Sequence, residues 1–251
     1  MVTGASSGIG QATAARLARS GWRVLAGVRR AGEAPGGTEE VLLDVTDPPM
    51  LELDRLDGLV NNAGIAVAGP LEFLSPDELR RQLEVNVVAQ LQMTQLLLPA
   101  LREARGRIVN VGSISGRSSL PFLGAYAMSK FALEAMSDAL RVELRPWGIH
   151  VAIVEPGTIK TPMWTRDRPD PPAEALKLYG DRLAAFRAFA LKRSASGAPA
   201  EAVAKVVEAA LTAGRPKARY LVGRDARIRS GVERLPDRLR DRVYQRVLGG
   251  T

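Results

Sequence analysis

Residues 2–10 read Val2-Thr3-Gly4-Ala5-Ser6-Ser7-Gly8-Ile9-Gly10 and lead into a segment, 11–20, in which Ala, Leu and Arg recur at helical spacing. A glycine-rich turn that opens a helix lets backbone N–H groups approach a pyrophosphate, and the helix N-terminus favours its negative charge. The spacing is Gly-x-x-x-Gly-x-Gly, which differs from the usual dinucleotide fingerprint, Gly-x-Gly-x-x-Gly. The stretch therefore predicts a strand, a phosphate-binding turn and a helix.

A second stretch, NVGSISGRSSLPFLGAYAMSK at Asn110–Lys130, carries candidate catalytic groups. Tyr126 and Lys130 are one helical turn apart, so a helix starting near residue 125 places them on one face. A phenol with a pKa of about 10 is a poor base at neutral pH, but a nearby cation lowers that pKa, so Tyr126 can serve as an acid/base. Ser113 follows a buried strand at 107–111 and can hydrogen-bond a substrate oxygen. Alone, a Tyr-x-x-x-Lys pair is usually surface decoration, and its meaning depends on the rest of the chain.

Together, these stretches resemble the classical short-chain dehydrogenase/reductase family, whose glycine motif is TGxxxGxG. Asn61-Asn62-Ala63-Gly64 matches the family's NNAG motif, and Asn86 matches its fourth catalytic position. Pro156-Gly157 with Thr161 matches its PG motif and the threonine near the nicotinamide carboxamide. The motifs follow in order over about residues 1–162. The resemblance implies one α/β domain over 1–251, a Rossmann-type doubly wound parallel sheet with helices on both faces.

The resemblance also implies the roles of these residues. Tyr126 exchanges the proton and Ser113 stabilises the substrate oxygen. Lys130 lowers the pKa of Tyr126 and holds the nicotinamide ribose, and Asn86 anchors a water in the proton relay. No metal site is implied. The implied cofactor contacts are Gly4, Ser6, Ser7, Gly8, Ile9, Gly10, Arg29, Asp44, Val45, Asn62, Ala63, Gly64, Tyr126, Lys130, Pro156, Gly157 and Thr161.

The cofactor's identity is predicted from the end of the second strand, Trp22–Val28, which Arg29-Arg30 follows. An acidic residue there binds the ribose 2′-hydroxyl of NAD, whereas an arginine accommodates the 2′-phosphate of NADP. Val28 stands where NAD-using members of the family carry the acid. We expect NADP(H), with NAD(H) less favoured and Arg29 a better candidate than Arg30. The alternative is that both arginines are merely solvated.

The sequence departs from the family pattern at two places. Only two residues precede Thr3, whereas a strand needs roughly five, so we expect either an extended N-terminus or a very short first strand. Between the third strand at 39–43 and the fourth at 59–62, only the eight residues PPMLELDR separate Asp47 from Leu56. A crossover helix needs about a dozen residues, so we expect one helical turn or an irregular link.

Two long helices are expected beside the site. Ser75-Pro76-Asp77-Glu78 is a helix start with a capping serine and proline at the first helical position, and the helix should run to about residue 104 with a perturbation near Pro99. The second runs from about 126 to 144. In the family these helices pair across a dimer axis, which implies a homodimer or homotetramer. Further expected elements are strands at 150–154 and 219–222 and a helix at 199–213, and His150 is interpreted as structural.

Residues 163–198 are predicted to form a substrate lid with a helix at about 172–191. They contain Trp164, Tyr179, Phe186 and Phe189, and such an aromatic-rich segment suits an apolar pocket. An equally favoured alternative is that the rings pack the helix onto the body. A bulky apolar alcohol or ketone, steroid-like or retinoid-like, is the expected substrate.

The composition of the chain limits where the protein can be located and which partners it can bind. The chain has no cysteine and no apolar run of 18 residues, so we expect a cytoplasmic protein. Residues 214–251 hold 11 Lys/Arg and 4 Asp/Glu, a net charge of +7 out of +8 for the chain. Acidic residues are interleaved and aromatic residues show no stacking pattern, which favours a solvated arginine-rich face over a nucleic-acid partner.

The last segment, 230–251, is predicted to be an amphipathic helix with Leu235, Leu239, Val243 and Val247 on one stripe. This extension resembles those of the hydroxysteroid- and retinol-dehydrogenase-like branch of the family. It can cover the substrate mouth, pack on a partner subunit or make a weak contact with a membrane surface.

The predicted activity is the interconversion of an alcohol and a carbonyl by hydride transfer. The alternative is a non-catalytic protein that senses the NADP(H) redox state. The combination of Asn86, Ser113, Tyr126 and Lys130 argues against a sensor, because a sensor has no need of the phenol.

Overall fold

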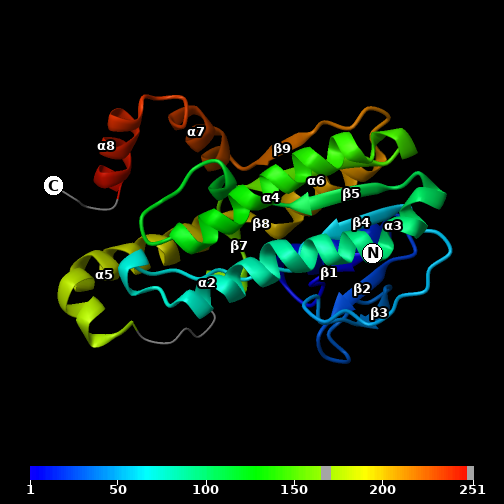
Figure 1. The fold of residues 1–251 in the computed structure, drawn as a ribbon, viewed down its shortest axis with the longest axis horizontal. Helices are drawn as coiled ribbons and strands as arrows, with labels where there is room; N and C mark the ends of the chain where they lie inside the picture. The colour runs from blue at the N-terminus through cyan, green and yellow to red at the C-terminus, as the bar shows by residue number, and fades with distance from the viewer. Residues whose placement is uncertain (165–170, 248–251) are drawn as a thin grey trace.

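A seven-stranded parallel sheet organises the chain in the computed structural model, which describes residues 1–164 and 171–247 (Figure 1). The strand order is β3-β2-β1-β4-β5-β6-β9, and every paired register is parallel. The order reverses beside β1, which makes the carboxyl ends of β1 and β4 the expected ligand crevice. The strands are β1 (Val2–Thr3), β2 (Leu25–Val28), β3 (Glu39–Leu42), β4 (Gly58–Asn61), β5 (Arg107–Val111), β6 (His150–Pro156) and β9 (Arg219–Val222).

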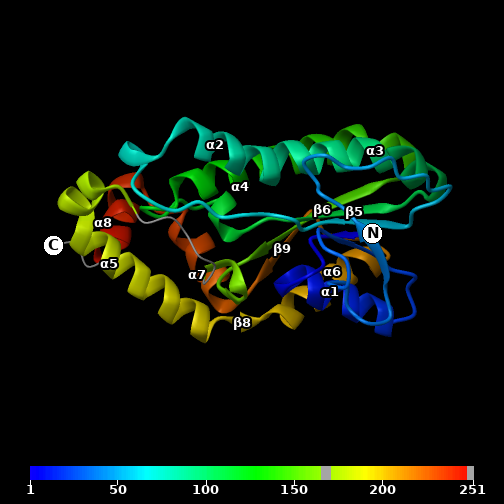
Figure 2. The ribbon, with the colours of Figure 1, turned by 90° about the horizontal axis from the view of Figure 1, so that it is seen from below.

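Helices cover both faces of the sheet, as predicted. Helices α1 (Gly8–Arg19) and α6 (Ala200–Thr212) lie on one face, and α3 (Ala89–Ala104) and α4 (Gly124–Glu143) lie on the other (Figure 2). Side chains alternate between these two layers because successive strand residues point to opposite faces. Val60 and Val109 pack with α1 and α6, whereas Leu59 and Ile108 pack with α3 and α4. The doubly wound α/β prediction is confirmed.

The predicted helix from residue 75 to 104 is one helical run with a change of winding. It begins at a capping box, in which Ser75 Oγ accepts from Glu78 N at 3.1 Å and the Glu78 carboxylate accepts from Ser75 N at 3.3 Å. The run comprises α2 (Pro76–Leu83), a π-helical turn η2 (Glu84–Val88) and α3. Helix α3 continues through Pro99, and the perturbation expected there stays a prediction. The irregularity lies at η2, and π turns of this kind are frequent at functional sites.

Both departures from the family pattern are visible in the structure. Strand β1 has two residues, and the buried N-terminal nitrogen of Met1 donates to Gly58 O at 2.7 Å. Residues 43–57, between β3 and β4, contain no helix. Leu56 is buried and Leu51 and Leu53 are partly buried against the α3 side of the core, so the irregular link itself covers this part of the sheet.

The segment between β6 and α6 lies outside the seven-stranded sheet. It contains a two-stranded parallel sheet of β7 (Ile159–Lys160) and β8 (Ala198–Pro199), and α5 (Ala173–Ser196), which extends past the predicted end at residue 191. Elsewhere in the described chain, the short 3-10 helices are η1 (Leu71–Phe73), η3 (Ile114–Gly116) and η4 (Arg145–Trp147), and η5 (Pro162–Trp164) follows β7. The predicted lid at 163–198 includes residues 165–170 and the side chain of Trp164, which lie outside the described part of the structure.

The predicted single helix over 230–251 is wrong in its bounds. The structure has α7 (Arg224–Val232) and α8 (Asp237–Val247), separated before Pro236, which lacks an N–H and disfavours a helical residue ahead of it. Leu235 and Leu239 of the predicted apolar stripe are 39% and 47% exposed, whereas Tyr244 is 7% exposed and anchors α8. Leu248 and the Val247 side chain lie outside the described residues. In the described part of the chain, we find no helix whose length and apolar character would let it cross a membrane.

Candidate active site

A cavity of about 980 Å³ opens at the carboxyl ends of the sheet strands. Its walls come from the turn between β1 and α1, the ends of β2 to β6, and residues of α5 and α7. Every predicted site residue lines this cavity except Gly10 and Asn86. The sequence motifs therefore converge on one site, at the place that the strand order predicts for a ligand.

The turn before α1 fits a phosphate group. Gly4 and Gly8 have φ of 65° and 57°, which side-chain-bearing residues rarely adopt, and a Cβ on Gly4 would lie 2.9 Å from Ala63 Cα. Ser6, Ser7, Gly8 and Ile9 line the cavity. The N-terminus of α1 has no side-chain cap and no acidic residue in its first turn. Its backbone N–H groups and dipole are thus suited to the pyrophosphate of a dinucleotide.

Gly10 and Asn62 hold this turn in place. A Cβ on Gly10 would lie 2.2 Å from Gly4 O, so Gly10 lets α1 pack closely behind the turn and does not face the cavity. The Asn62 Nδ2 donates to Thr3 O at 2.9 Å and to Gly4 O at 3.2 Å. The glycine motif and the NNAG motif are therefore two halves of one hydrogen-bonded unit.

The ends of β2 and β3 separate the two candidate arginines. Arg29 lines the cavity with Asp44 and Val45, whereas Arg30 does not line it and lies 3.7 Å from the Glu33 carboxylate. Hydrogen bonds from Thr46 and, more weakly, the charge of Arg29 lower the pKa of Asp44. The cavity wall at the end of β2 thus carries a cation and no carboxylate.

Tyr126, Ser113 and Lys130 meet at the centre of the cavity. Burial raises the pKa of Tyr126, and a hydrogen bond with Ser113 and the charge of Arg229 offset this only in part. Lys130 Nζ donates to Val111 O at 2.8 Å and lies 5.8 Å from the Tyr126 ring centroid, and burial lowers its own pKa to about 8. The sequence predicted a lowered pKa for Tyr126, whereas desolvation of the buried phenol outweighs the Ser113 hydrogen bond and the charge of Arg229 and raises it.

Asn86 lies behind the cavity wall, fully buried in the π turn η2. Its Oδ1 accepts from Ile65 N at 2.9 Å, and its Nδ2 donates to Ile65 O at 3.0 Å and to Ser129 Oγ at 3.0 Å. Gln82, which the sequence analysis missed, supports the same loop, because its Oε1 accepts from Val67 N at 2.6 Å. The Asn86 side chain supports the loop after the NNAG motif in this structure, and its predicted part in a water relay stays a prediction.

A pair of buried acids lies below Lys130. Glu134 is one helical turn further along α4, and Glu155 at the end of β6 is fully buried. Burial raises the pKa of Glu134 to about 7, and the neighbouring Glu155 adds to the increase. Arg219 Nε lies 3.0 Å from Glu134 Oε2 and 3.7 Å from Glu155 Oε1. The sequence analysis missed this pair because its members come from distant segments.

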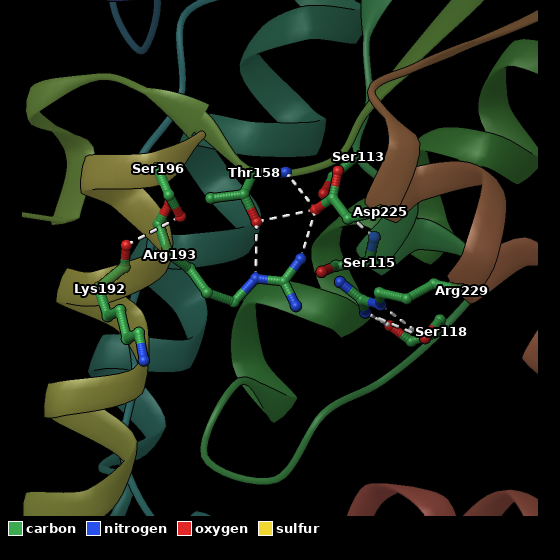
Figure 3. A network of polar contacts seen from close by, with 9 residues as sticks. All are labelled: Ser113, Ser115, Ser118, Thr158, Lys192, Arg193, Ser196, Asp225 and Arg229. Atoms are coloured by element: carbon green, nitrogen blue, oxygen red, sulfur yellow. Dashed lines mark hydrogen bonds and ion pairs between the residues drawn. The ribbon is translucent and has the colours of Figure 1, made fainter. Parts of the chain in front are cut away.

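The Pro156-Gly157 turn packs against α7 at Asp225. A Cβ on Gly157 would lie 2.1 Å from Asp225 Oδ1, and the Asp225 carboxylate accepts from Thr158 N at 2.7 Å and Thr158 Oγ1 at 2.8 Å (Figure 3). Thr161 faces the glycine turn, because its Cγ2 would lie 3.2 Å from a Cβ on Gly8. Asp225 therefore sets the position of a motif that the sequence analysis described without it.

Part of the remaining cavity wall is apolar. Phe186 and Phe189 of α5 line it with Leu120, Leu123 and Met163. In contrast, the Tyr179 hydroxyl donates to Glu72 at 2.7 Å. The predicted pocket role thus suits Phe186 and Phe189, and the packing alternative suits Tyr179.

The fold and the site define a Rossmann-type oxidoreductase. The short chain dehydrogenase family model matches residues 38–172, and the chain belongs to that family. In the described residues, no group of three or more side chains could hold a metal ion.

Three similar proteins span nearly all of the chain. NADPH-dependent 3-dehydrocapnine reductase of Ornithobacterium rhinotracheale is 35% identical over 99% of this chain and 96% of its own length. Retinol dehydrogenase 5 of Mus musculus is 35% identical over 90% of this chain and 81% of its own, in agreement with the predicted retinol-dehydrogenase-like branch. The crystal structure of a short chain dehydrogenase from Burkholderia cenocepacia J2315 in complex with NADP has a TM-score of 0.74 at 28% identity, covering 98% of this chain and 96% of that one.

Proposed function

We propose that the protein uses NADP(H) to reduce a ketone or aldehyde to an alcohol, with the reverse oxidation catalysed at the same site. The observation that carries this proposal is the hydrogen-bonded pair of Tyr126 and Ser113 in the cavity, with Lys130 beside it. The raised pKa of Tyr126 keeps its phenol protonated at neutral pH, which is the form that can donate a proton.

The cofactor, when bound, supplies the hydride that reaches the carbonyl carbon. Ser113 donates a hydrogen bond to the carbonyl oxygen and stabilises the negative charge that develops on it. Tyr126 donates its hydroxyl proton to that oxygen, which completes the alcohol. Lys130, fixed by Val111 O, keeps a cation beside the phenolate that forms.

NADP(H) is favoured over NAD(H) by the end of β2. Arg29 lines the cavity there and is placed to pair with a ribose 2′-phosphate, whereas the end of β2 offers no acidic residue to bind a 2′-hydroxyl. The relative named as NADPH-dependent and the related structure in complex with NADP support the same cofactor.

We also propose that the protein is a homodimer or homotetramer in the cytoplasm, joined through the α3 and α4 face. Phe131 is 44% exposed and Met128 41% exposed on α4, and Val88 of η2 is 40% exposed. Apolar side chains gathered on one surface favour a protein partner. The exposed Leu235 and Leu239, with the arginines of α8, leave a weak membrane-surface contact as a second role for the C-terminal segment.

A fluorescence titration with NADPH and with NADH, followed by turnover on a panel of carbonyl compounds, tests the proposal. We expect tighter binding of NADPH and its oxidation by at least one carbonyl of the panel. NADPH binding without turnover of any carbonyl or alcohol would instead favour the redox-sensor alternative, for which the site offers no support at present.

A further inference from the structure

Two arginines lie in the wall of the substrate end of the cavity. Arg193 comes from α5 and Arg229 from α7, and both line the cavity that holds Ser113 and Tyr126. Figure 3 shows their guanidinium groups pointing toward one another from helices on opposite sides. Their charges act on each other, since Arg193 helps to lower the pKa of Arg229. Two like charges in one apolar cavity wall are costly unless an anion shares them.

Among the described residues, Asp225 is the carboxylate that forms an ion pair with one of these arginines. Arg193 Nη2 lies 2.6 Å from Asp225 Oδ2, and its Nε donates to Thr158 Oγ1 at 3.1 Å. Arg229 donates instead to neutral groups, at 2.9 Å to Ser118 O and 3.0 Å to Ser118 Oγ. Among the described residues, no carboxylate forms an ion pair with Arg229. Of the two arginines, Arg229 therefore has no ion-pair partner within the described part of the chain.

The C-terminal segment fixes Arg229 in this position. Tyr244 of α8 is 7% exposed, and its hydroxyl lies 2.6 Å from Ser118 Oγ, the same atom that accepts from Arg229. The Tyr244 hydroxyl also donates to Glu233, in the link between α7 and α8. A guanidinium held by such a network is preorganised to bind an anion, because little side-chain entropy is left to lose.

We propose that Arg229, assisted by Arg193, binds an oxyanion group of the substrate, so that the substrate is an acidic ketone with an apolar remainder. Planar guanidinium groups bind carboxylate and sulfonate groups through paired hydrogen bonds. The apolar remainder lies along Leu120, Phe186 and Phe189, which line the same cavity. This inference rests on the proposed reductase function and names its substrate class. The anionic group itself is unchanged in the reaction.

An anion at Arg229 would also act on Tyr126. The charge of Arg229 lowers the pKa of Tyr126, and a bound anion would cancel that charge. The phenol then holds its proton more firmly until the carbonyl oxygen becomes basic during hydride transfer. Substrate binding and the protonation state of Tyr126 are linked in this way.

The first experiment compares straight-chain oxo acids that differ in the spacing of the two groups with their methyl esters as substrates for NADPH oxidation. We expect kcat/KM to be about ten- to a hundredfold higher for the best acid than for its ester, because charge-assisted hydrogen bonds are lost in the ester. In Arg229→Gln this preference should disappear, mainly through a higher KM for the acid. Arg227→Gln, an exposed arginine on the same helix, is the matched control and should keep the preference.

Equal kcat/KM for every acid and ester in the wild-type protein would overturn the inference, as would an acid preference that survives in Arg229→Gln. NADPH titration of each variant verifies that the cofactor site is folded.

If no carbonyl is reduced, the proposed function fails, and a calorimetric titration with decanesulfonate tests the anion site alone. Saturable binding to the wild type that is at least tenfold weaker in Arg229→Gln supports it, and absent or unchanged binding overturns it.

Discussion

The two ends of the cavity are built in different ways. At the cofactor end, the wall is mostly main chain at the turns after β1, β4 and β6, and glycines allow close approach. At the substrate end, side chains from the loop after β5 and from α5, α7 and α8 meet. A main-chain site needs small residues at fixed spacing, and so it leaves a motif. A side-chain site can be assembled from many residue combinations, and so it leaves none.

The largest expected effect is the loss of turnover in Tyr126→Phe. We expect kcat to fall about a thousandfold, because the proton donor is removed, while NADPH binding is kept. Steady-state kinetics and a fluorescence titration measure the two quantities. Tyr179→Phe is the control, since that hydroxyl is bonded to Glu72 at the outer surface, and it should keep nearly full activity. A Tyr126→Phe protein that retains most of its rate would contradict the assignment of the proton donor.

Arg29→Gln tests the cofactor end. We expect NADPH to bind about ten- to a hundredfold more weakly, because the pairing with the 2′-phosphate is lost, and NADH binding to change little. Arg30→Gln is the matched control, since Arg30 does not line the cavity. Unchanged NADPH affinity in both variants would mean that both arginines are only solvated.

The difference between the two ends explains what could be predicted from the sequence. The strands, the phosphate-binding turn and the Tyr126–Lys130 pair follow from local periodicity and residue spacing. The other cofactor residues follow from the resemblance to the family, and the structure brings nearly all of them to one cavity. Asp225 and Arg229 could not be predicted, because their partners Thr158 and Ser118 are 67 and 111 residues away in the sequence. The direction of the pKa shift of Tyr126 could not be predicted from the sequence either, since it depends on how deeply the phenol is buried.

Gly157→Ala tests the contact between the two ends, because the Pro156-Gly157 motif of the cofactor end packs against Asp225 of α7. An added methyl group would meet Asp225 Oδ1 at 2.1 Å and push the carboxylate away from Thr158. We expect the free energy of unfolding to fall by about 1–3 kcal/mol. Urea unfolding of both single variants and of Gly157→Ala with Asp225→Ala measures the coupling. If the double variant loses the full sum of the two single effects, the clash is not the cause.

The smallest expected effect is on the pH dependence of stability. It involves Glu134, which lies one helical turn after Lys130 on α4. The pKa of Glu134 is about 7 in the folded protein and 4.5 without its surroundings, so between these pH values the native state binds more protons than the unfolded state. The contribution of Glu134 to the free energy of unfolding therefore falls as pH rises from 4.5 through 7, whereas the buried N-terminus of Met1, whose pKa is lowered from 8.0 to about 5, contributes a rise from pH 5 to 8.

Glu134→Gln should remove this fall, because a neutral amide can still accept from Arg219 and does not repel Glu155. We expect the variant to exceed the wild type in stability by about 1 kcal/mol at pH 8 and not at pH 5, measured by urea unfolding. Glu143→Gln, at the exposed end of α4, is the control and should keep the wild-type slope. Because the pKa of Lys130 is lowered to about 8, its burial makes stability rise again from pH 8 toward 10.5, and this second limb should persist in Glu134→Gln. A difference in stability between the variant and the wild type that does not grow from pH 5 to pH 8 would place the proton on another group.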